Sequence, residues 1–162
     1  MQLCFYLSLL LPGMLAFSSP TPVDKRAGAP VRSPIPASCT VSDPLPSTAE
    51  VPAGATPTAS SLKPSDDFYN EHILYSYYLS APPPDSNASS LVTDCQETCY
   101  SYGNHTECQA AWFAYYVQAP PDQGGQVSNY ACLNFDAPLE ESDSEDAAAG
   151  RWINGTVANI AC

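Results

Sequence analysis

The chain has 162 residues, which leaves room for one domain and a tail, and it carries 17 acidic against 5 basic side chains, a formal net charge of −12 at pH 7. A surface this acidic repels nucleic acid and anionic membranes at ordinary salt, so nucleic-acid binding is excluded.

The first 26 residues predict two processing steps. Residues 3–17 form an apolar run shorter than the roughly 20 residues of a membrane-spanning helix, and Ala16 and Ser18 suit a cleavage site. We predict a signal peptide over 1–18; no Lys or Arg precedes the run, and a membrane anchor is the alternative. The pair Lys25 and Arg26 resembles the kexin-type sites of fungal secreted proteins and predicts a propeptide over 19–26, unless it is an ordinary charged pair. We therefore expect a secreted protein, extracellular or cell-wall associated, with no membrane span after processing.

Cleavage after Arg26 leaves three basic side chains, Arg32, Lys63 and Arg151, against 16 acidic ones. It also leaves an even number of cysteines, Cys39, Cys95, Cys99, Cys108, Cys132 and Cys162. In an oxidising compartment six cysteines predict three disulfides, and the sequence lacks the paired knuckles of a zinc site. Spacing alone does not choose among the possible pairings.

Residues 27–65 have a biased composition, with Pro, Ser, Thr and Ala at 26 of 39 positions. Such a segment buries too little apolar surface to offset its ordering entropy, so we expect a flexible arm whose Ser and Thr residues are candidate O-glycosylation sites. Cys39 is the feature that ties this arm to the rest. A folded domain is expected over 66–162.

Within that domain the sequence predicts four strands and one helix. Residues 70–80 favour a strand, with a short helix as the alternative. Residues 90–102 favour a helix with Ser90 as its cap and Gly103 after its end, and with Cys95 and Cys99 on its apolar stripe. Further strands are expected at 107–118, 129–135 and 152–162, and an acidic loop at 139–150. In the strand at 107–118, alternation places Phe113, Tyr115 and Val117 on one face.

Three sequons, at Asn87, Asn104 and Asn154, are candidate N-glycosylation sites, which predicts that they face solvent.

Three stretches of this domain resemble a known family. They are Asp94-Cys95-Gln-Glu-Thr-Cys99, Cys108-Gln-Ala-Ala-Trp-Phe-Ala-Tyr-Tyr and Tyr130-Ala-Cys132-Leu-Asn-Phe-Asp136. Their order and spacing resemble the PAN/apple module, and more narrowly the apple-like domains of fungal secreted proteins, over about residues 73–162. The resemblance implies an α+β fold, one helix packed on an antiparallel sheet and stapled by disulfides. It also implies the pairs Cys95–Cys132, Cys99–Cys108 and Cys39–Cys162.

The sequence predicts no catalytic, cofactor or metal site. His72 has no nucleophile motif beside it, and His105 lies within a sequon. The acids of 140–146 lack the ligand order and central glycine of a calcium loop, so a solvated surface is expected.

Aromatic side chains are the remaining resource for binding. Tyr77, Tyr78 and Tyr116 are the candidate ligand contacts, since tyrosine offers rigid, amphipathic surface to sugars and proteins. The first hypothesis is a secreted non-enzymatic binding module that contacts an extracellular polysaccharide or glycoprotein. The alternative is a structural or effector-like surface glycoprotein without a discrete ligand pocket.

Overall fold

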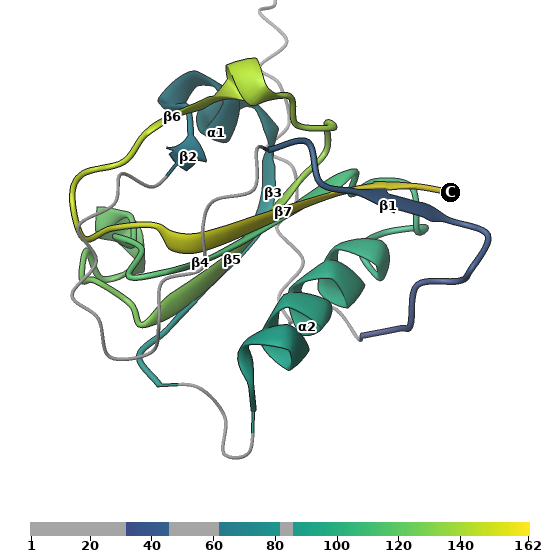
Figure 1. Ribbon diagram of the computed structural model, residues 1–162, viewed down its shortest axis with the longest axis horizontal. Helices are drawn as coiled ribbons and strands as arrows, with labels where there is room; N and C mark the ends of the chain where they lie inside the picture. The colour runs from purple at the N-terminus through teal and green to yellow at the C-terminus, as the bar shows by residue number, and fades with distance from the viewer. Residues whose placement is uncertain (1–31, 46–61, 82–85) are drawn as a thin grey trace, which may run out of the picture.

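A five-stranded antiparallel sheet forms the centre of the computed structural model, which describes residues 32–45, 62–81 and 86–162. Its strand order is β1-β7-β4-β5-β3 (Figure 1). The strands are β1 (Thr40–Ser42), β3 (Ile73–Leu79), β4 (Ala110–Tyr115), β5 (Tyr130–Phe135) and β7 (Ile153–Ala161). The predicted signal peptide and propeptide, and parts of the predicted arm, lie outside the described residues.

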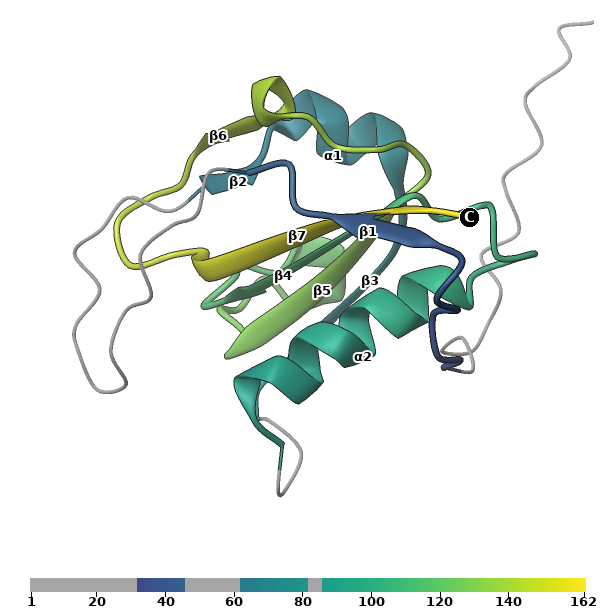
Figure 2. The ribbon, with the colours of Figure 1, turned by 45° about the vertical axis from the view of Figure 1, so that its right-hand side comes forward.

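Both faces of the sheet are covered. One face carries the long helix α2 (Ala88–Tyr100), and the other carries α1 (Asp66–His72) and the two-stranded sheet of β2 (Leu62–Pro64) and β6 (Ser144–Asp146) (Figures 1 and 2). The central strands β4 and β5 are therefore buried almost throughout, which explains their continuous apolar sequences. Trp112 belongs to the core cluster on the α1 face, and Phe113 to the cluster under α2.

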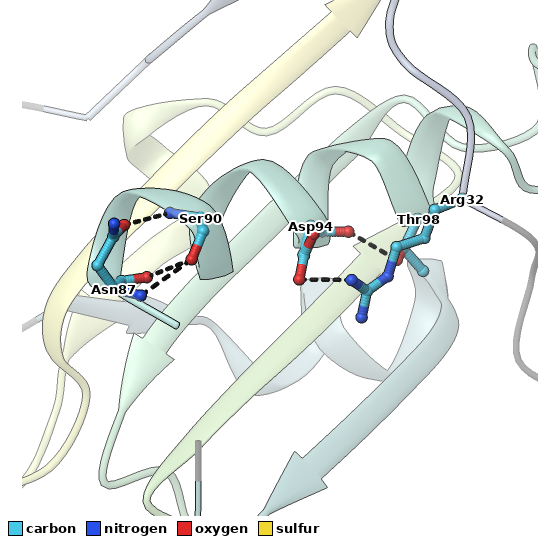
Figure 3. Close-up of polar contacts among 5 residues, drawn as sticks. All are labelled: Arg32, Asn87, Ser90, Asp94 and Thr98. Carbon is cyan, nitrogen blue, oxygen red and sulfur yellow. Dashed lines mark hydrogen bonds and ion pairs between the residues drawn. The ribbon is translucent and has the colours of Figure 1, made fainter. Parts of the chain in front are cut away.

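Helix α2 begins two residues earlier than the sequence predicts, because Asn87 and not Ser90 is its N-cap. The Asn87 side chain accepts a hydrogen bond from the Ser90 backbone N at 2.8 Å, and the Ser90 Oγ accepts one from the Asn87 N at 3.0 Å (Figure 3). This reciprocal pair is a capping box, in which Ser90 occupies the third helical position. The helix ends at Tyr100, and Gly103 adopts a left-handed φ of 61° in the loop that follows.

The residues before β3 differ from the expected strand. Residues 66–72 form α1, capped by the Ser65 Oγ, which accepts from the Phe68 N at 3.2 Å. The extended chain starts only at Ile73, and a register shift between Ile73 and Tyr75 breaks its alternation. Both the predicted strand and its helical alternative are thus partly right.

Two parts of the predicted arm form strands. β1 pairs with β7 at the edge of the main sheet, and β2 pairs with β6, which lies inside the predicted acidic loop. β1 and β2 have three residues each, and each is fixed by a partner strand about 80 residues or more away in the sequence. The segment 32–45 therefore folds onto the domain, with the Arg32 guanidinium paired to Asp94 on α2 (Figure 3).

Three disulfides join the elements, in the pairs that the family resemblance implies. Cys95–Cys132 links α2 to β5, and Cys99–Cys108 links α2 to the chain just before β4. These four cysteines are buried in the cluster beneath α2. Cys39–Cys162 joins the start of β1 to the end of the chain after β7. None of the described helices is long and apolar enough to cross a membrane.

Candidate functional site

A pocket of about 470 Å³ lies on the α1 side of the sheet. Its walls come from β2, α1, β3, the segment 118–121 after β4, and the turn 148–152 that leads into β7. Three aromatic rings line it, Tyr69, Tyr78 and Trp152. Prolines, alanines and Gln118 complete a mostly apolar wall. The volume falls in the range of about 300–1,000 Å³ found for small-molecule sites.

The two tyrosines are coupled to each other inside the pocket. Their hydroxyl oxygens are 3.2 Å apart, so one hydroxyl donates to the other. Burial raises the pKa of Tyr78 far above its ordinary value, and the hydrogen bond with Tyr69 raises it further. Tyr78 therefore stays neutral at physiological pH, and two hydroxyls that share one hydrogen bond keep a second hydroxyl hydrogen to donate to a ligand.

Trp152 reaches the pocket through an unusual backbone. Its φ is 54°, the left-handed region, which is a strained conformation for a bulky residue. Gly150 and Asn154 on either side also have positive φ, at 77° and 49°. The half-buried ring meets Trp112 edge-on, with ring centroids 6.0 Å apart and planes at 78°. The turn thus holds Trp152 between the core and the pocket.

The two basic side chains that line the pocket differ in their partners. Lys63 Nζ pairs with Asp66 at 2.7 Å and also with Glu145. Desolvation by itself lowers the pKa of Lys63, but the hydrogen bonds and charges of the two carboxylates outweigh it and leave the pKa raised. Arg151 also lines the pocket, and within the described residues its guanidinium forms no ion pair or hydrogen bond.

The predicted contact residues do not form one surface. Tyr78 lines the pocket, whereas Tyr77 lies on the opposite face of the sheet with the α2 cluster, where burial raises its pKa to about 12. Tyr116 is 44% exposed and follows β4 with a left-handed φ of 54°. That turn also moves Val117 to the α1 face, opposite to the alternation expected from the sequence.

The sequence analysis missed Tyr69, Trp152 and Arg151 as site residues. The one feature of the sequence that could have indicated this pocket is the scarcity of basic residues. Two of the three basic side chains in the described residues, Lys63 and Arg151, line it. Their positions are 88 residues apart in the chain, so no local pattern connects them.

The two histidines do not line the pocket, whereas the acidic segment borders it through Glu145. The His72 Nδ1 is 2.9 Å from the Asp136 Oδ1, and exposed His105 stacks on Tyr100 with ring centroids 4.6 Å apart. In the acidic segment Glu145 is paired with Lys63. Among the described residues no group of three or more His, Cys, Asp or Glu side chains is placed to hold a metal ion.

The three sequon asparagines, Asn87, Asn104 and Asn154, are all exposed. At Asn87 the cap uses the side-chain oxygen, which leaves the amide nitrogen, the atom that carries an N-glycan, outside this bond. Their glycosylation stays a prediction.

No protein-family model matches this chain, and no curated protein or solved structure matches it. The resemblance to the PAN/apple module therefore rests on the three sequence stretches and their cysteine spacing, and the argument for function rests on the geometry of the pocket.

Proposed function

We propose that this protein is a secreted, non-enzymatic binding module that holds carbohydrate of the cell surface or wall in the pocket lined by Tyr69, Tyr78 and Trp152. The observation that supports this proposal best is the convergence of three aromatic rings and several polar groups on one open pocket. Aromatic faces cover the apolar face of a sugar ring, while hydroxyl, amide and guanidinium groups bind its hydroxyls. An open pocket of this volume can hold a saccharide unit whose neighbouring units extend into solvent.

The same pocket gives little support to catalysis. Asp66 is the one carboxylate among the described residues that line it, and Lys63 holds that carboxylate at 2.7 Å. Glycoside hydrolysis in most families needs two carboxyl groups about 5–9.5 Å apart across the scissile bond. We therefore assign the pocket to binding.

We also propose a PAN/apple-like identity for the domain. Its support is the helix–sheet arrangement together with the disulfides Cys95–Cys132, Cys99–Cys108 and Cys39–Cys162. Three disulfides in one small domain fit an oxidising, extracellular setting, which agrees with the predicted signal peptide, the dibasic site and the exposed sequons. Modules of that family contact proteins and carbohydrates outside the cell.

A depletion assay with insoluble chitin, β-glucan and mannan tests the proposal on the mature, disulfide-intact protein. Saturable binding is expected to at least one polysaccharide, with at least tenfold weaker binding after Tyr78→Ala or Trp152→Ala. Tyr75→Ala is the matched control, because Tyr75 lies on the same strand but packs against Tyr102 on the α2 side. Absence of saturable binding to all three would favour the alternative, a surface glycoprotein without a discrete pocket.

A further inference from the structure

Among the three basic side chains of the described residues, one has no acidic partner. Arg32 pairs with Asp94, and Lys63 pairs with Asp66 and Glu145. Arg151 has neither an ion pair nor a side-chain hydrogen bond within the described residues, although the chain has 17 acidic side chains against 5 basic ones. In so acidic a protein, a cation on a pocket wall that pairs with none of the described acidic side chains needs an explanation.

From this arrangement we propose that the pocket selects a short acidic saccharide, whose carboxylate pairs with Arg151 while its ring lies against Trp152 and Tyr78. The inference rests on the proposed function and names the ligand class of the same pocket. A guanidinium presents two parallel N–H donors that match the two oxygens of a carboxylate. The partly buried position of Arg151 strengthens such a pair relative to one in open water.

The surroundings limit the negative charge that the ligand can carry. Asp66 lines the pocket, Glu145 lies against Lys63, and Asp122 is near enough to act electrostatically on Tyr78. One guanidinium balances one carboxylate, whereas a phosphate monoester, with a charge of about −1.5 to −2 at pH 7, would place extra charge beside these acids. The pocket therefore fits a singly charged group.

The net charge of the chain adds a second limit, on ligand length. A long polyuronate would bring many negative charges close to a protein of net charge −12, and that repulsion disfavours binding at low salt. A chain end or a short oligomer brings few. The ligand expected here is therefore a uronate at the end of a short saccharide.

Calorimetry with the mature protein tests this, using galacturonate and glucuronate dimers against their methyl esters. The esters keep the sugar ring, replace the charged carboxylate by a neutral group and add one methyl group. We expect the acids to bind about tenfold more tightly than the esters, the size of effect that one charged hydrogen-bonded pair gives. Acid binding should also weaken as the ligand carboxyl protonates at low pH, while ester binding should not.

Measuring the Arg151→Gln variant with the same acids and esters completes a thermodynamic cycle that isolates the interaction between Arg151 and the ligand carboxylate. The variant should bind acids and esters equally, and its urea midpoint should stay close to that of the wild type because Arg151 has no ion-pair or side-chain hydrogen-bond partner among the described residues. Arg32→Gln is the control: its charge is on the α2 side, and the acid preference should persist.

The outcomes separate the two proposals. Equal affinity for acid and ester in the wild type would overturn the acidic-ligand inference and leave the binding module standing. No binding by acids, esters or the three insoluble polysaccharides would overturn both. Tighter binding of a short peptide with a free terminal carboxylate than of any uronate would overturn the saccharide class. An acid preference that survives Arg151→Gln would remove Arg151 from the site.

Discussion

Replacing Trp152 with alanine and, separately, with glycine removes the same ring in both variants. Each loses the edge-on contact with Trp112 and the burial against the core, so the difference between the two variants measures only the backbone. At an ordinary strand position glycine is the worse residue, by about 0.5–1 kcal/mol relative to alanine. At Trp152 the φ of 54° should reverse that order.

The size of the reversal follows from two opposing terms. A residue with a Cβ costs roughly 1–2 kcal/mol in the left-handed region, and glycine avoids this cost. The greater conformational freedom of glycine in the unfolded chain destabilises the glycine variant by about 0.5–1 kcal/mol. The Trp152→Gly variant should therefore be about 0.5–1 kcal/mol more stable than Trp152→Ala. With a urea m value of about 2 kcal/mol/M, that difference moves the unfolding midpoint by about 0.3–0.5 M.

Urea unfolding of the disulfide-intact variants measures this difference, with Ala161→Gly as the control. Ala161 is an exposed residue of β7 with an ordinary backbone, so glycine should lower stability there by about 0.5–1 kcal/mol. A Trp152→Ala variant as stable as Trp152→Gly, or more stable, would refute the left-handed turn at the pocket. Both variants should lose ligand binding equally, because binding uses the ring.

Three further predictions concern the scaffold. Replacing Cys39 and Cys162 with serine removes a cross-link over 123 residues, and unfolding in urea should show a loss of about 4.9 kcal/mol in the chain-entropy treatment; a loss below about 1 kcal/mol would contradict it. Asn87→Ala should lower the free energy of unfolding by about 1 kcal/mol because the helix loses its cap. Asn87→Asp keeps the cap and removes the sequon, so a similar loss of stability in both variants, measured on unglycosylated protein, would count against the capping box. Burial raises the pKa of Tyr77 to about 12 and also raises the pKa of Tyr78, whereas an exposed tyrosine has a pKa of about 10. The contribution of these two side chains to stability is therefore complete below about pH 10 and is lost as the pH rises toward about 12. Urea midpoints that stay constant across that alkaline window would contradict this burial.

The helix and the central strands were predictable because their signals are local. The stripe of Leu91, Cys95 and Cys99 identifies α2, and the predicted strand 129–135 differs from β5 by one residue. The cap was misassigned to Ser90 since both Ser90 and Asn87 are good capping residues, and only the capping box distinguishes them. Local propensity is enough to predict a helix or strand when the pattern of buried side chains favours the same element.

The short strands β1, β2 and β6 could not be read from the sequence. Each has three residues, and all three residues of β1 are exposed, so neither length nor apolar periodicity marks β1. They are extended because a distant strand supplies their hydrogen-bond partners. The face of Val117 was predicted wrongly for a related reason, because the left-handed φ of Tyr116 changes the alternation at a point that the sequence does not mark.

The two sides of the sheet are stabilised by different means. The α2 side holds two buried disulfides, Cys95–Cys132 and Cys99–Cys108, which fix the helix to β5 and to the chain before β4. The pocket side holds no disulfide within the described residues, and there β2 and β6 are joined by backbone pairing and by the ion pair of Lys63 with Glu145. Cross-links on one side keep the sheet in place without occupying the opposite side. That division leaves the aromatic pocket free of cross-links, on a sheet that disulfides hold from the other side, which suits the proposed binding function.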